Sequence, residues 1–153
     1  TLGLEGPNVT VSQEELSFEG ALLDAILALR AGEVDHALVG GVDLRTGDEA
    51  DHRRRIGAAG IDGEIGDGSA WMLLGTGGAA TIASVRVGRD LGPLPETAIL
   101  AGWRTDLPGR DRRLIPIATG MRLVDVLEGT EMGTFTHVQR SASGREARVE
   151  LRR

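Results

Sequence analysis

Two carboxylates, Glu14 and Glu15, stand where the sequence predicts that a strand ends and a helix begins. The apolar run Val9–Val11 is expected to be a short strand, and Ser17–Ala31 carries the apolar repeat of a helix. Ser12 and Glu15 fit the Ser-x-x-Glu pattern of a capping box, in which the two side chains satisfy free amides of the first turn. Acidic residues at a helix start also suit the helix dipole. The sequence therefore predicts that Ser12 and Glu15 cap this helix.

Other residue types that perform nucleophilic or acid–base chemistry are scarce. The chain has no Cys, which excludes a catalytic thiolate, disulfides and thiolate metal sites. His36, His52 and His137 have no identifiable acid–base partner, and each is predicted to be a solvated or structurally satisfied side chain. The acidic stretch at residues 48–52 fits a polar loop of mixed charge better than a metal site. We predict no bound metal.

The segment from residue 3 to residue 43 resembles the β-ketoacyl synthases of the thiolase-like superfamily. Gly6-Pro7-Asn8 and Thr10-Val11-Ser12 match the family run Gly-Pro-Asn-x-Thr-Val-Ser, which continues as Thr-Ala-Cys in those enzymes. After the helix, residues 32–43 match the family pattern Gly-x-x-Asp-x-Ala-Leu-x-Gly-Gly-Val. On this alignment Gln13 replaces the Thr, and Glu15 falls at the acyl-accepting Cys.

The resemblance implies an acyl-binding pocket at this junction, formed by Ser12, Glu15 and Phe18, with Gln13 beside Glu15. A carboxylate is a poor acyl acceptor compared with the thiolate that a condensing enzyme uses. The two His residues of the family are also unmatched. The first would fall in Ile99–Asp106, which contains none, and Leu114 takes the position of the second.

Weaker similarity extends along the rest of the chain. Residues 66–74 resemble a glycine-rich turn and strand of the family, and residues 141–151 resemble its glycine-rich turn and last strand. The subgroup most similar is the degenerate ketosynthase-like proteins, including chain-length factors, which lack the Cys and pair with an active synthase. The resemblance implies an α/β, thiolase-like αβαβα layered fold with mixed sheets. Because the family has another half before the Gly-Pro-Asn turn, we expect residues 1–153 to be one such domain, incomplete at its N-terminal side, as a fragment or the ordered part of a longer chain.

The order of predicted elements agrees with an α/β fold. Gly32 should close the first helix, and Ala37–Val42 reads as a strand buried on both faces, parallel to Val9–Val11. The later elements are strands at 69–74 and 79–87, a short strand at 98–101, a helix at 121–127, and paired strands at 134–138 and 147–151. Gly75–Gly78 predicts a hairpin, since neither a P-loop nor a dinucleotide fingerprint fits it. We predict no cofactor.

Composition and charge narrow the class of partner. The chain is 41% hydrophobic with 23 Gly residues, as expected for strands and helices joined by many turns. A net charge of −6 argues against a nucleic-acid partner. No apolar run approaches the length of a membrane span, so we expect a cytoplasmic protein without membrane insertion. The basic clusters Arg53–Arg55 and Arg110–Arg113 either are solvated loops or dock an acidic acyl carrier protein.

Three hypotheses for function remain open. The first is a non-catalytic ketosynthase-like subunit of chain-length-factor type, which acts with an active β-ketoacyl synthase in fatty acid, polyketide or polyene biosynthesis. The expected assembly is a heterodimer with that synthase, or else a homodimer. The second is a relative with altered chemistry, in which Glu15 or Gln13 assists decarboxylation of an acyl thioester. The third is a stand-alone degenerate module with a binding or structural role.

Overall fold

The first helix, α1 (Ser17–Ala31), spans the predicted residues and ends at Gly32, which confirms the prediction. Gly32 has a φ of 71°, in the left-handed region that glycine adopts without steric cost, and its N–H bonds to the carbonyls of Ala28 and Leu29. The second described helix, α3 (Ala118–Glu128), contains the predicted segment 121–127. This computed structural model describes residues 5–13, 15–43, 68–95, 98–100, 118–141 and 143–153.

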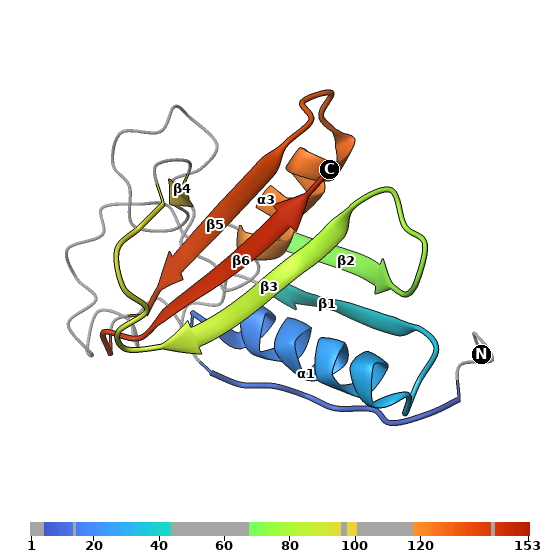
Figure 1. Cartoon of the computed structure of the whole chain (residues 1–153). Coiled ribbons are helices and arrows are strands. Elements are labelled where there is room, and N and C mark those ends of the chain that lie inside the picture. The colour runs from blue at the N-terminus through green and yellow to red at the C-terminus, as the bar shows by residue number, and fades with distance from the viewer. Residues whose placement is uncertain (1–4, 14, 44–67, 96–97, 101–117, 142) are drawn as a thin grey trace.

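The strands of the described residues form two sheets (Figure 1). The first is an antiparallel pair of β1 (Ala37–Asp43) and β2 (Gly68–Leu74). The second has the order β3-β6-β5-β4, built from β3 (Thr81–Gly88), β4 (Ala98–Leu100), β5 (Thr134–Arg140) and β6 (Glu146–Arg152). The predicted pairing of the last two strands is confirmed, with Val138 opposite Arg148, and β4 adds to β5 in parallel. The larger sheet is therefore mixed, as expected.

The two helices lie between the two sheets. Helix α1 contacts β1 on one side and β3 and β6 on the other, while α3 contacts β2, β5 and α1. The core draws its buried apolar side chains from both helices and both sheets: Phe18, Leu22, Val39, Ala70, Met72, Leu123, Val149 and Leu151. Gly120 of α3 makes this packing possible, because a Cβ there would lie 2.8 Å from a ring carbon of Phe18. The described residues thus form a sheet–helix–sheet sandwich.

Strand β1 departs from the prediction in its partner and its burial. The predicted run Val9–Val11 forms no strand, and Val9 is exposed, since no described strand lies beside it to pair with. Strand β1 therefore belongs to no parallel unit and pairs with β2 instead. Among the described elements, helices cover only one face of the pair, and β1 has exposed residues, so the expectation of a strand buried on both faces was wrong. The uncovered face carries four exposed apolar side chains: Leu38, Val42, Trp71 and Leu73.

The predicted hairpin around Gly75–Gly78 was also wrong, although both of its strands exist. Strand β2 pairs with β1, and β3 pairs with β6, so the turn carries the chain from one sheet to the other. Gly77 has a φ of 83° and provides the left-handed turn residue. The polar stretch at 46–63 and the final residue of the predicted strand at 98–101 lie outside the described residues.

Candidate functional site

The chain makes a tight turn before α1, and this turn replaces the predicted capping box. The N–H of Leu16 donates to the carbonyl of Gln13 (3.0 Å), and the N–H of Gln13 donates to the hydroxyl of Ser17 (2.9 Å). The helix begins at Ser17 with Leu16 at the N-cap, without a side-chain cap. Ser12 is exposed and lies before this turn of the chain. It is too far ahead of Ser17, the first helical residue, for its side chain to reach the helix amides. The capping prediction for Ser12 and Glu15 was therefore wrong.

Glu15 lies two residues before the first residue of α1 and is half-buried. Its Oε2 is buried and has no hydrogen-bond partner among the described residues. A buried carboxylate oxygen without a partner is rare and calls for a water, a ligand or another explanation. Phe18, which was grouped with Ser12 and Glu15 as a pocket residue, is 4% exposed and packs in the core. The structure thus places Glu15 immediately ahead of α1 and the Phe18 side chain in the hydrophobic core.

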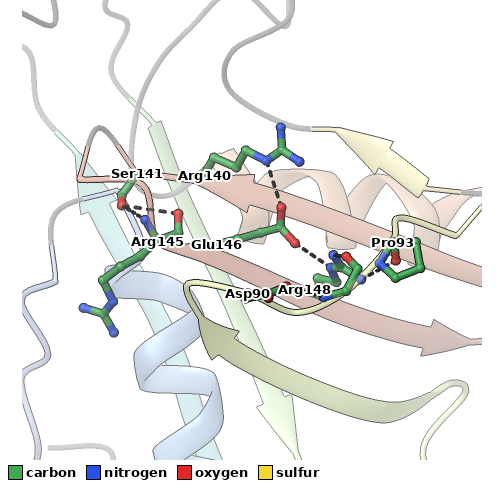
Figure 2. Close-up of polar contacts among 8 residues, drawn as sticks. Asp90, Pro93, Arg140, Ser141, Arg145, Glu146 and Arg148 are labelled. Atoms are coloured by element: carbon green, nitrogen blue, oxygen red, sulfur yellow. Dashed lines mark hydrogen bonds and ion pairs between the residues drawn. The ribbon is translucent and has the colours of Figure 1, made fainter.

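The turn between β5 and β6 lies against the segment that precedes α1. The guanidinium of Arg145 donates to Gln13 Oε1 in a long hydrogen bond of 3.4 Å. The backbone N–H of Ser141 donates to the Arg145 carbonyl (2.9 Å), and the Ser141 hydroxyl accepts from the Arg145 N–H (Figure 2). Gly144, at a φ of 78°, allows this turn to close. The structure therefore joins Gln13 to the predicted glycine-rich turn, a contact across 132 residues.

Glu146 anchors a charged network on the outer face of the larger sheet (Figure 2). It accepts hydrogen bonds from Arg140 (2.8 Å) and from the buried Arg148. Arg148 also donates to the carbonyls of Gly92 and Pro93, which fastens this loop across the strands. Burial raises the pKa of Glu146, but the two guanidinium groups outweigh burial through hydrogen bonds and charge, and its pKa is lowered overall.

A second polar cluster lies inside the sandwich and was not predicted. The Thr119 hydroxyl on α3 contacts Glu19 Oε1 on α1, and it lies 2.8 Å from Nε2 of His137 on β5. Glu19 and Thr119 are fully buried, and His137 is 4% exposed. Burial raises the pKa of Glu19 to about 7 despite the hydrogen bonds from Thr119 and the backbone. Burial, with the nearby charge of Arg122, lowers the pKa of His137 to about 3.

A cavity of about 360 Å³ lies between α3 and β5 beside this cluster. Its wall includes the apolar side chains of Leu123, Val126 and Phe135 together with the ring of His137. A second cavity, of about 260 Å³, lies between the outer face of the larger sheet and the loop at Pro93–Pro95. None of the predicted site residues lines either of these two cavities.

Several predicted residues stay apart from the turn before α1 or cannot be placed. His36 is exposed immediately before β1, in agreement with a solvated side chain, whereas His137 is bonded inside the sandwich. Glu14, His52, Leu114 and both arginine clusters lie outside the described residues. Within the described ranges, no group of three or more His, Asp or Glu side chains is arranged to hold a metal ion. No helix among those ranges is long and apolar enough to cross a membrane.

Comparison with known proteins identifies the fold. No protein-family profile and no curated protein matches the sequence. Among solved structures, the chain is similar to the ishigamide ketosynthase/chain length factor, with a TM-score of 0.70 and 16% sequence identity. The match covers 97% of this chain and 57% of that chain, so the sequence spans little more than half of the protein that it resembles. The chain therefore has a partial thiolase-like fold of the ketosynthase/chain-length-factor kind.

Proposed function

We propose that this chain is a non-catalytic ketosynthase-like subunit of chain-length-factor type, which acts with an active, Cys-bearing β-ketoacyl synthase. The observation that carries the proposal is Glu15 at the position where the family pattern has its acyl-accepting Cys, in a chain without any Cys. The fold shared with a ketosynthase/chain length factor supports the alignment on which that position depends. The biosynthetic setting that we propose is fatty acid, polyketide or polyene assembly.

The chemistry at Glu15 supports a non-condensing role. A condensing enzyme holds its acyl group on a thiolate, which a helix N-terminus stabilises. A carboxylate in that place would have to form a mixed anhydride, which is a poor acyl carrier. The two described His side chains give Glu15 no base: His137 is bonded to Thr119, and His36 is exposed before β1.

The uncovered face of the β1–β2 pair supports the presence of a protein partner. Leu38 and Leu73 are 49% and 70% exposed and lie opposite each other in the pair. Trp71 is 55% exposed and lies against Gly40, where a Cβ would fall 2.4 Å from a ring carbon of the indole. Adjacent exposed apolar side chains of this size are typical of protein interfaces. We propose a ketosynthase as this partner and an acyl carrier protein as the source of the chain.

One observation favours a second candidate, in which the site retains decarboxylating chemistry. Glu15 Oε2 is buried and has no described partner, so it is able to accept a hydrogen bond from a water molecule beside a bound acyl thioester. Gln13 is less suited to this role, because its Oε1 already accepts from Arg145.

The test is incubation of the chain alone with acyl and malonyl thioesters of an acyl carrier protein. Intact-mass measurement should show no acyl adduct, and product analysis should show neither a β-ketoacyl product nor loss of CO₂ from the malonyl group. Decarboxylation that disappears in Glu15→Gln would support the second candidate. A covalent acyl-enzyme or a condensation product would overturn the proposal.

A further inference from the structure

Glu19, Thr119 and His137 come from three different elements and meet through one hydroxyl group. Thr119 Oγ1 contacts Glu19 Oε1 on one side and His137 Nε2 on the other. Each of the three side chains is at most 4% exposed. Glu19 Oε2 and His137 Nδ1 are buried and have no partner among the described residues. The cluster is therefore a short chain of hydrogen bonds shielded from bulk water.

Two arrangements that place one hydrogen in each of the two contacts differ in the tautomer of His137. A hydroxyl carries one hydrogen, and a neutral imidazole carries one on either Nδ1 or Nε2. When Glu19 is a carboxylate, Thr119 donates to it, so His137 must donate from Nε2 and its Nδ1 is bare. When Glu19 is a carboxylic acid that donates to Thr119, Thr119 donates to Nε2, so the hydrogen of His137 is on Nδ1.

We propose that Glu19, Thr119 and His137 form a buried proton relay, in which loss or gain of one proton at this cluster switches the tautomer of His137. The acid form holds three protons, on Oε1, Oγ1 and Nδ1. The anionic form holds two, on Oγ1 and Nε2. Deprotonation therefore removes the proton from Nδ1, while the Thr119 proton moves to Nε2 and the Glu19 proton moves to Oγ1. One proton leaves the cluster, no heavy-atom bond changes, and the carboxyl group takes up the negative charge.

The titration properties agree with this relay. Burial raises the pKa of Glu19 to about 7, so the carboxyl group changes its charge near neutral pH. Burial and the charge of Arg122 lower the pKa of His137 to about 3, so the imidazole stays neutral over that range. A change in His137 near neutral pH would thus report a tautomer switch and not ionisation of its own ring.

Among the described residues, Arg122, Asp125 and Glu131 are the charged side chains that line the cavity together with His137. On α3, Arg122 acts on His137, while Asp125 and Glu128 are exposed. Ahead of α1, Glu15 is the nearest carboxylate along the chain. On β6, Val149 and Leu151 belong to the core, so the alternating charged residues of that strand face away from the helices. These are the residues Glu146, Arg148, Glu150 and Arg152, with Arg86 of β3 opposite Arg148.

The switch alters a wall of the cavity between α3 and β5. The ring of His137 is part of that wall, beside the apolar Leu123 and Phe135. Moving the hydrogen between the two ring nitrogens reverses the ring dipole, so the same cavity favours different polar groups in the two states. The relay does not depend on the proposed partner and holds for the chain alone.

The experiment is long-range ¹H–¹⁵N NMR of the ¹⁵N-His-labelled chain from about pH 5 to about pH 9. His137→Gln identifies the ring signals by their loss. The unprotonated ring nitrogen of His137 should be Nε2 at low pH and Nδ1 at high pH, and the change between the two should have its midpoint near pH 7. Glu19→Gln should abolish the change, because an amide does not titrate, and Thr119→Val should abolish it by removing the hydroxyl.

Two matched variants keep the test decisive. Thr119→Ser retains the hydroxyl and should retain the switch, even if Thr119→Val fails to fold. Asp24→Asn removes an exposed carboxylate of α1, the helix that carries Glu19, and should leave the midpoint unchanged. A His137 tautomer that stays constant across the range, or a switch that persists in Glu19→Gln or Thr119→Val, would overturn the relay.

Discussion

Glu19 places a carboxyl group within the buried face of α1, one residue after Phe18 and three before Leu22. Burial of the charged form is costly, so the folded protein retains a proton that the unfolded chain loses. The unfolded side chain titrates near its ordinary value of 4.5, and the folded one near 7. Stability from this group is therefore fully present below the lower value and is lost as pH rises through the higher one.

Glu19→Gln should remove this alkaline loss of stability. The difference in unfolding free energy between pH 5 and pH 8 should shrink in the variant by about 3 kcal/mol at most, which is the pKa difference converted at 1.36 kcal/mol per unit. Urea melts at the two pH values measure it, with Asp24→Asn, which removes an exposed carboxylate of the same helix, as the control. An equal pH dependence in Glu19→Gln and the unmodified chain would show that Glu19 is ionised in the fold at both pH values.

At the residue scale, the sequence singles out Glu15 as a candidate, which stays a prediction, but it could not predict the contacts of the relay. Glu15 follows a recognisable local run, and its position needs no knowledge of the rest of the chain. Glu19 and Thr119 are 100 residues apart, and Thr119 and His137 are 18 apart, so only tertiary packing brings them together. The sequence did contain a signal that these polar side chains are buried. Glu19 follows Phe18 in the apolar repeat of α1, and His137 shares the inner face of β5 with Phe135.

At the element scale, the packing of α1 against α3 depends on one residue without a side chain. A Cβ on Gly120 would lie 2.8 Å from Phe18 Cε2 and 2.9 Å from Ala70 Cβ. Gly120→Ala should therefore cost about 1–3 kcal/mol of stability through overpacking. Gly78→Ala is the control, since its nearest atom would be 3.5 Å away. Thermal or urea melts compare the two, and similar stability in both would contradict close packing of the helices.

Arg148 of β6 is 4% exposed and attaches the loop at Gly92 and Pro93 to the outer face of the larger sheet through hydrogen bonds. Arg148→Met should leave the carbonyls of Gly92 and Pro93 without their donor and should cost about 3 kcal/mol. Arg152→Met is the matched control, because the exposed Arg152–Glu150 pair should contribute less than about 1 kcal/mol. Urea melts of the two variants test the difference, and limited proteolysis should cleave the loop near Pro93 faster in Arg148→Met alone.

The elements and the one strand pair that local signals define, β5 with β6, were predicted, whereas strand pairs between distant segments were not. The apolar repeat and Gly32 define α1, and the short connection between β5 and β6 leaves little choice of partner. Strands β1 and β2 pair although residues 44–67 separate them in the sequence. Strands β3 and β6 pair although most of the second half of the chain lies between them. The turn at Gly75–Gly78 gives the same local signal for a hairpin as for a crossing between sheets, so sequence could not separate the two.

At the scale of the whole molecule, the described residues form a sheet–helix–sheet sandwich in which no described element covers the outer face of the β1–β2 pair. It spans 57% of the ketosynthase/chain-length-factor chain that it matches. The exposed Leu38, Val42, Trp71 and Leu73 on the β1–β2 pair give this face the apolar character of an interface. Under the proposed function, we therefore expect the chain to act in a complex whose partner supplies the catalytic thiol.

Reconstitution with a Cys-bearing ketosynthase tests this account most directly. The two chains should be co-expressed, separated by size exclusion, and assayed with an acyl carrier protein and its malonyl thioester. The account predicts a stable heteromeric complex whose products change in chain length, or disappear, when this chain is left out. A monodisperse monomer that does not bind the ketosynthase, together with identical products in its presence and absence, would contradict the account.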